Sequence, residues 1–141
     1  MTREQILTVA QQRTEAMNRH DIRALVGLYG LAAQVESPLA GSTIEGRSAI
    51  EKVFRSIFTA FPDLRLEPDH YVVDGDMVAA SSLMTGIYAG GFMGIPPTGK
   101  PMRVPTVTLS RVVDGEIVWE RRVYDITSML IQSGILRTSG H

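Results

Sequence analysis

The chain has 141 residues, enough for one domain with a buried core and a pocket but too few for a second domain. Its 14 Lys and Arg residues nearly balance its 15 Asp and Glu residues, and it has no basic run, so we expect no nucleic-acid partner. The absence of cysteine excludes disulfides, thiolate catalysis and cysteine-ligated zinc. The histidines have no HExxH or paired spacing, so we expect no metal site.

The N-terminal residues 1–21 are polar and follow a helical pattern, without the apolar core of a signal peptide. No run along the chain approaches the roughly 20 apolar residues that a membrane-spanning helix needs. We therefore expect a soluble, cytoplasmic protein that makes no membrane contact.

Two helices are predicted at the start of the chain. Thr2 and Gln5 form a capping-box pattern, and apolar residues recur at helical spacing behind them, so the first helix should end near Asn18. Asp21 is placed to cap a second, shorter helix. A short strand is then predicted over 34–38, because Pro38 ends the apolar alternation there.

The clearest single element is a helix over 48–61. Its apolar residues follow the i, i+3, i+4, i+7 spacing of one helix face, and Pro62 stops it. After this helix the apolar pattern changes to a period of two, which is typical of strands with one buried face.

Two Asp-Gly pairs, at 74–75 and 114–115, each separate apolar runs and are the strongest short-range signal for hairpin turns. They predict strands over 64–73, 77–88, 102–113 and 116–125. A last short helix is predicted over 126–132. Helices followed by antiparallel hairpins indicate an α+β fold in which helices cover one face of a sheet that can enclose a cavity.

Three segments carry a family resemblance: GRSAIEKVFRSIFTAFPDL at 46–64, GIPPTGK at 94–100, and DGEI at 114–117 with Asp125 ten residues after Gly115. The chain resembles SnoaL-like polyketide and ester cyclases of the nuclear transport factor two-like superfamily over nearly its whole length. The resemblance implies a single domain over 1–134, and the polar end of the chain predicts a loose tail over 135–141. It also implies a cone-shaped, curved antiparallel sheet with helices on its concave face around an apolar pocket, a homodimer, and no cofactor.

Asp125 is the leading catalytic candidate. The resemblance places it where a buried aspartate of the family performs acid/base work in an intramolecular aldol closure, and a desolvated carboxylate could take a proton from carbon and return it. The competing interpretation is that Asp125 caps the short helix starting at Ile126. The chain departs from the family at Tyr88, which replaces a usual histidine, and at Arg121, which replaces a usual tryptophan while Trp119 lies two residues earlier.

The hairpin register predicts which side chains meet in the pocket. A two-residue turn at 114–115 pairs Val113 with Glu116, so alternate residues of the strand before the turn share a face with alternate residues after it. The face expected to line the cavity carries Thr106, Thr108, Trp119, Arg121, Val123 and Asp125. The alternative is that this face is exposed to solvent.

Three further residues are candidates for chemistry. Tyr88 could donate a hydrogen bond to an enolate or carbonyl oxygen, or serve only as a pocket wall. Glu36 could be a second carboxylate opposite Asp125, as in epoxide-opening relatives, or a solvated strand end. Arg121 could neutralise an oxyanion or pair with Glu36 or Asp125. The remaining predicted pocket residues are Tyr29, Phe58, Met84 and Phe92.

The segment GIPPTGK fits the letters of a phosphate-binding loop, but Pro101 follows it and two prolines remove backbone donors. We interpret it as a lid or dimer-contact loop. The leading hypothesis for function is a cofactor-free cyclase or isomerase that performs aldol-type ring closure on a small apolar, polyketide-like substrate. The alternatives are an epoxide hydrolase or epoxide-opening cyclase of the limonene-epoxide-hydrolase type, and a non-catalytic binding domain.

Overall fold

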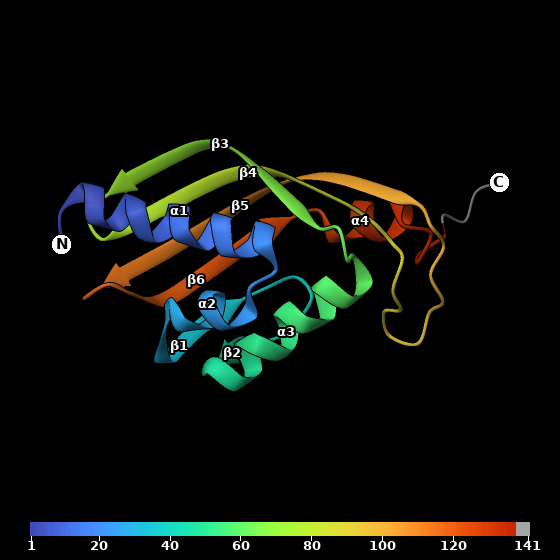
Figure 1. The fold of residues 1–141 in the computed structure, drawn as a ribbon, viewed down its shortest axis with the longest axis horizontal. Helices are drawn as coiled ribbons and strands as arrows, with labels where there is room; N and C mark the ends of the chain where they lie inside the picture. The colour runs from blue at the N-terminus through green and yellow to red at the C-terminus, as the bar shows by residue number, and fades with distance from the viewer. Residues whose placement is uncertain (138–141) are drawn as a thin grey trace.

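The computed structural model describes residues 1–137. The helices in this range are α1 (Arg3–Arg19), α2 (Ile22–Gly27), α3 (Arg47–Ala60) and α4 (Ile126–Gln132). The strands are β1 (Tyr29–Glu36), β2 (Ile44–Glu45), β3 (Arg65–Asp74), β4 (Met77–Ile87), β5 (Pro101–Val113) and β6 (Glu116–Tyr124). The expected α+β fold is therefore confirmed, and the helices and strands follow the order that the periodicities predict (Figure 1).

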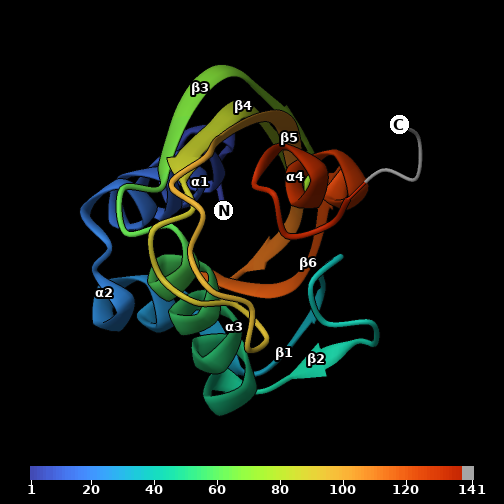
Figure 2. The same cartoon turned by 90° about the vertical axis from the view of Figure 1, so that its right-hand side faces the viewer.

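The strands form one curved, unclosed sheet in the order β2-β1-β6-β5-β4-β3. All neighbours pair antiparallel except β1 and β6, which run parallel. The expectation of a purely antiparallel sheet was wrong here, because turn signals report only on strands adjacent in sequence, and β1 and β6 stand at opposite ends of the chain. Figure 2 shows the sheet curving around α1 and α3, which lie on its concave side.

Both hairpins form where the Asp-Gly pairs lie. Val113 pairs with Glu116, so Asp114 and Gly115 make the predicted two-residue turn, with φ of 50° and 81° respectively. Positive φ at both central positions is the geometry of the tight turn that matches the strand twist, and Asp-Gly adopts it readily. The β3–β4 turn lies one residue later than predicted, because Asp74 itself pairs with Met77.

The helices begin as their capping residues predict. The Thr2 hydroxyl accepts from the Gln5 amide while the Gln5 side chain accepts from the Thr2 amide, so the capping box is present. Asp21 caps α2 by accepting from the Ala24 amide. The apolar face of α3 is buried against the sheet, with Phe54 only 1% exposed. This packing makes α1 and α3 two walls of the concave space.

The C-terminal segment is held more firmly than predicted. The amides of Ile135 and Leu136 donate to the Leu130 carbonyl at 2.9 and 3.0 Å, so the expected loose tail does not begin at 135. The rest of that prediction, over 138–141, lies outside the described residues. None of the helices within 1–137 combines the length and apolar character needed to cross a membrane.

Candidate functional site

A β-bulge in β6 decides which side chains face the concave space. Val112 pairs with Ile117, but the next pair is Arg111 with Trp119, so Val118 is an extra residue on β6. Because strand side chains alternate, one extra residue reverses the faces of everything beyond it. The pairs on the inner face are therefore Ser110 with Glu120, Thr108 with Arg122, and Thr106 with Tyr124.

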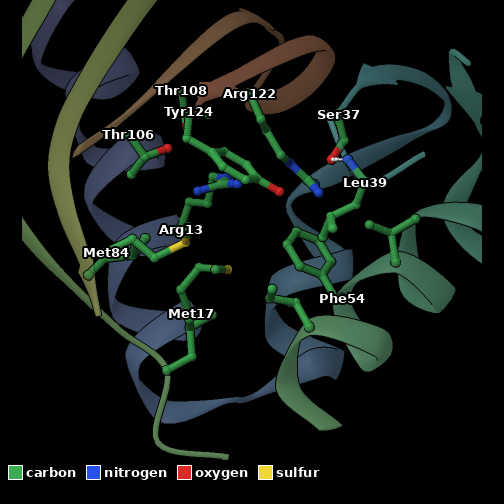
Figure 3. A pocket seen from close by; sticks show the side chains of 14 residues that line it. Arg13, Met17, Ser37, Leu39, Phe54, Met84, Thr106, Thr108, Arg122 and Tyr124 are labelled. Carbon is green, nitrogen blue, oxygen red and sulfur yellow. Dashed lines mark hydrogen bonds between the residues drawn. The ribbon is translucent and has the colours of Figure 1, made fainter. Parts of the chain in front are cut away.

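The inner face of the sheet, α1, α3 and the segment after β1 enclose a cavity of about 40 Å³, which has space for roughly three water molecules (Figure 3). Its apolar lining consists of Met17, Leu39, Val53, Phe54, Ile57, Leu64, Leu66 and Met84. Its polar lining consists of Arg13, Ser37, Thr106, Thr108, Arg122 and Tyr124. The cavity is thus an apolar hollow with a cluster of hydrogen-bond donors on one side.

Beneath this polar side lies Glu120, whose side chain has no exposed surface. Its carboxylate contacts two guanidinium groups, with Arg13 Nε at 2.9 Å and Arg122 Nε at 2.8 Å. The Tyr29 hydroxyl donates to both carboxylate oxygens, at 2.8 and 2.7 Å, and Arg13 Nε donates to that hydroxyl at 2.9 Å. The Ser110 hydroxyl donates at 3.3 Å. A buried charge is tolerated when it is paired and hydrogen-bonded in this way.

The electrostatics of this cluster follow from burial and charge pairing. Burial alone would raise the pKa of Glu120, but the charges of Arg13 and Arg122 and the Tyr29 hydroxyl outweigh it and lower that pKa. Burial raises the pKa of Tyr29. Glu120 therefore stays ionised and hydrogen-bonded to its partners, which makes it an anchor for the two arginines and a poor proton acceptor.

The two arginines extend from this anchor to the cavity wall. Their side chains are 7% and 9% exposed, and the guanidinium carbons of Arg13 and Arg122 lie 5.9 and 4.3 Å from the centre of the Phe54 ring. An aromatic face stabilises a guanidinium without neutralising it. Figure 3 shows both guanidinium groups and the Tyr124 phenol converging at one side of the cavity.

Tyr124 supplies the only phenol among the residues that line the cavity in 1–137. Burial raises the pKa of Tyr124 to about 12, and the smaller effects of the Arg122 charge and the Ser37 hydroxyl oppose that rise. A phenol with this pKa is protonated near neutral pH, so it presents an O–H donor to whatever enters the cavity.

Asp125 does not occupy the predicted position. It is exposed, it does not line the cavity, and its carboxylate accepts from the Ser128 amide at 2.9 Å as the N-cap of α4. The expectation that this carboxylate is desolvated was wrong, because the bulge at Val118 turns Asp125 away from the inner face. Of the two interpretations from sequence, the structure supports the helix cap.

Tyr88 is buried but also lies away from the cavity. Its hydroxyl donates to the Ile95 carbonyl and its ring packs against Phe61, so it anchors the loop over 89–99. The loop also docks at Gly90, where an added Cβ would lie 1.8 Å from the Thr59 carbonyl oxygen. Phe92 lies on this loop and borders a shallow hollow on the outside of α3 instead of the cavity.

The outer face of β6 carries the other predicted residues. Arg121 pairs with Glu36 at 3.0 Å, one of the pairings predicted for it, but both side chains are partly exposed, at 52% and 38% respectively. The Arg121 guanidinium also stacks over Trp119, 5.2 Å from the ring centre. Trp119, Arg121 and Glu36 therefore do not line the cavity. Glu36 and Arg121 instead border a more open hollow beside it, which Ser37, Arg122 and Tyr124 also border.

Five pocket predictions remain to be placed. Thr106, Thr108 and Met84 line the cavity. Tyr29 lies one layer deeper, on Glu120, and Phe58 stacks on the His20 ring at a centroid distance of 4.2 Å instead of facing the cavity.

Sequence analysis missed Arg13, Glu120, Arg122 and Tyr124. For Arg13 a signal existed: it lies four residues after Val9 and four before Met17, so it interrupts the buried face of α1 with a charge. For the three β6 residues no such signal was available, because the bulge decides which alternate residues of β6 face inward. Within 1–137, no three His, Asp or Glu residues gather as metal ligands.

Comparison with known proteins places this fold and cavity in a family. A model of SnoaL-like polyketide cyclases matches residues 8–133. The chain belongs to the SnoaL-like polyketide cyclase family. A search among curated proteins found no match.

Among solved structures, this SnoaL-like chain is similar to IdmH of Streptomyces antibioticus, a proposed polyketide cyclase. The two are 29% identical, with a TM-score of 0.78, over 92% of this chain and 98% of IdmH. AclR of Streptomyces galilaeus, a proposed hydroxylase, is 24% identical with a TM-score of 0.85, over 99% of this chain and 87% of AclR. A proposed polyketide cyclase of Xanthomonas campestris is 21% identical, with a TM-score of 0.85, over 93% and 98%. The last two show the shared fold.

Proposed function

We propose that this SnoaL-like protein is a cyclase that closes a ring in a small apolar, polyketide-like substrate by an aldol-type step. Membership of the family supports a cyclase or isomerase kind of activity. The observation that carries the finer proposal is the convergence of Arg122 and Tyr124 on the polar side of a cavity whose other side is apolar. Donors fixed in an apolar site stabilise charge that develops on an oxygen.

In the proposed step, the substrate enters with one carbonyl group as its enol. The enol carbon attacks a second carbonyl carbon, and a carbon–carbon bond forms as that carbonyl oxygen becomes an alkoxide. Arg122 stabilises the developing charge and Tyr124 donates its proton to the oxygen. The Tyr124 oxygen then takes the proton that the enol hydroxyl releases, so the phenol returns to its starting state and no proton is gained or lost.

The proposed mechanism needs no carboxylate in the cavity. Glu120 is ionised but enclosed by its partners, and Asp125 is outside. A phenol whose pKa lies near 12 holds its proton until a more basic oxygen forms beside it. Tyr124 therefore suits a step in which an alkoxide appears and disappears, and suits less well the direct deprotonation of an unactivated carbon.

A non-catalytic binding function is the second candidate, and one observation favours it. Among the described residues, no carboxylate or imidazole lines the cavity, so the usual general bases are not in contact with a bound molecule. The epoxide-opening alternative loses support for the same reason, because it needs a carboxylate to aim water and Glu36 is engaged with Arg121 on the outer face. The homodimer expected from the resemblance stays a prediction, which size-exclusion chromatography tests.

The test of the catalytic proposal is Tyr124→Phe, assayed on a phenyl-substituted linear triketone whose aldol closure followed by loss of water gives a dihydroxybiphenyl. We expect kcat to fall by about 100-fold or more with little change in KM, because the lost donor acts on the transition state. Product formation is followed by ultraviolet absorbance and NMR.

The matched control is Tyr71→Phe, which removes a phenol that contacts the Thr14 hydroxyl at 2.9 Å and does not line the cavity. This variant should keep its kcat within about twofold. Equal activity of Tyr124→Phe and the wild type would refute the mechanism. A wild type that binds the triketone without converting it would support the binding function instead.

A further inference from the structure

We propose that the cavity binds a monoanion whose charge is shared by two oxygen atoms, held by Arg13 and Arg122. A carboxylate and an ionised 1,3-dicarbonyl both have this chemistry. The inference rests on the proposed function and deepens it, because it names an anionic group of the substrate, separate from the neutral enol that attacks, that the same site binds. Three observations support it: the net charge of the buried cluster, the unused N–H donors of the two arginines, and the burial of both arginine side chains.

The buried cluster carries unequal charge. Two guanidinium groups face one carboxylate, which leaves one positive charge without a counterpart in the cluster. No Asp or Glu is among the described residues that line the cavity, and the nearby Glu36 is paired with Arg121 on the outer face. The polar side of the cavity is therefore positive.

The guanidinium groups also have donors to spare. Each guanidinium has five N–H groups. Arg13 uses Nε and Nη2, and Arg122 likewise uses Nε and Nη2, all toward Tyr29 and Glu120. Within 1–137, no side-chain or backbone acceptor forms a hydrogen bond with Nη1 of either arginine. These two groups are available to a bound molecule.

Burial makes this arrangement informative. Both arginine side chains are more than nine-tenths buried, so the few water molecules that the cavity can hold solvate the surplus charge less well than bulk water would. Two guanidinium groups, each with an unused Nη1, can bind a group with two oxygens better than a single oxygen. An anion of this kind would neutralise the surplus charge, whereas a neutral ligand of the same shape would leave it in place.

The rest of the cavity defines the body of the ligand. Phe54, Met17 and Met84 contribute ring and thioether surfaces, so the anion should be attached to an aromatic or compact apolar group. The cavity as it stands holds only about three water molecules, so a ring can enter only when side chains move, and methionine side chains repack easily around a ligand. Small molecules such as benzoate, which need the least rearrangement, are therefore the appropriate first probes.

The first experiment compares charged and neutral isosteres on the wild-type protein by calorimetry and NMR titration. Benzoate is compared with benzamide, and ionised dimedone with its neutral methyl enol ether, so that the carboxylate and the dicarbonyl are tested separately. We expect each anion to bind at least about tenfold more tightly than its neutral partner. A preference for only one anion identifies which of the two sources the site accepts, and no preference for either overturns the proposal.

The second experiment identifies which arginine of β6 causes the preference for the anion, by replacing two neighbouring arginines in separate variants. Arg122→Met removes the inner guanidinium and should lower benzoate affinity at least about tenfold while benzamide affinity stays the same. Arg121→Met removes the outer one, which does not line the cavity, and should change neither affinity. Equal losses in both variants would place the anion on the surface and overturn the proposal.

Arg122→Lys covers the case in which the methionine variant does not fold, since it retains the charge and loses the guanidinium that binds Glu120 and the ligand at the same time. It should bind benzoate less tightly than the wild type and keep the preference over benzamide. These binding results are independent of turnover. An anion preference without conversion of the triketone would remove the cyclase proposal alone, and conversion without an anion preference would remove this inference alone.

Discussion

The two faces of β6 carry similar residues in opposite surroundings. Arg122 and Tyr124 alternate on the inner face, while Arg121 and Trp119 lie on the outer face. Each arginine pairs with a glutamate, but the inner partner Glu120 is fully buried and the outer partner Glu36 is 38% exposed at its side chain. The comparison shows that the position of a residue relative to the bulge, and not its type, decides whether it faces the cavity.

The environment also sets how strongly each ion pair matters to the fold. The outer pair is partly exposed to solvent, so its attraction is screened and it contributes at most about 1 kcal/mol. Removing one partner of the inner cluster leaves buried charge without compensation, which costs about 3–5 kcal/mol. Neutralising the inner glutamate and the outer glutamate in separate variants therefore tests whether the two ion pairs differ in their contribution to stability.

The largest expected effect belongs to Glu120→Gln. The amide keeps the shape and can still hydrogen-bond Tyr29, but Arg13 and Arg122 lose their shared counter-charge. We expect the free energy of unfolding, measured by urea denaturation, to fall by about 3 kcal/mol or more. Glu36→Gln, the matched change on the outer face, should lower it by less than about 1 kcal/mol. Similar losses for the two variants would contradict the comparison.

The pH dependence of the unfolding free energy should also show that Glu120 stabilises the fold. The native state holds the pKa of Glu120 below its ordinary value of 4.5, so the unfolded chain binds the proton more readily. The stabilisation from this carboxylate is complete above that value and is lost as the pH falls through the lower native pKa. Below about pH 4.5, the unfolding free energy of the wild type should therefore decline more steeply than that of Glu120→Gln. Parallel curves for the two proteins would show that Glu120 is not held by its partners.

The smallest expected effect is that of Asp125→Ala. Loss of the N-cap of α4 should lower the free energy of unfolding by about 1 kcal/mol. Turnover of the triketone should stay within about twofold of the wild type, since this carboxylate is outside the cavity. A loss of turnover as large as that expected for Tyr124→Phe would restore Asp125 as the catalytic group and remove Tyr124 from that role.

Much of the fold could be predicted because its signals are local. Thr2 and Gln5 identify the start of α1, Pro62 the end of α3, and Asp114 with Gly115 the β5–β6 turn, each through backbone geometry within a few residues. The parallel pairing of β1 with β6 joins distant parts of the chain, and no local pattern reports it.

The site was harder to predict than the fold for a related reason. The inner residues Thr106 and Thr108 were identified correctly as one face of β5, but their partners on β6 were displaced by one position. No glycine or turn-forming residue lies beside Val118, so the sequence does not indicate a bulge there. A single unmarked residue therefore exchanged the inner and outer faces of β6, and with them the candidates for chemistry.

The most direct measurement is a crystal structure of the protein with benzoate bound, since it shows which face of β6 receives the ligand. We predict the carboxylate within hydrogen-bond distance of Arg13 and Arg122, close to the Tyr124 hydroxyl, with the ring against Phe54. Benzoate bound at Arg121 on the outer face, with the cavity left empty, would contradict the claim that the inner face of β6 is the functional one.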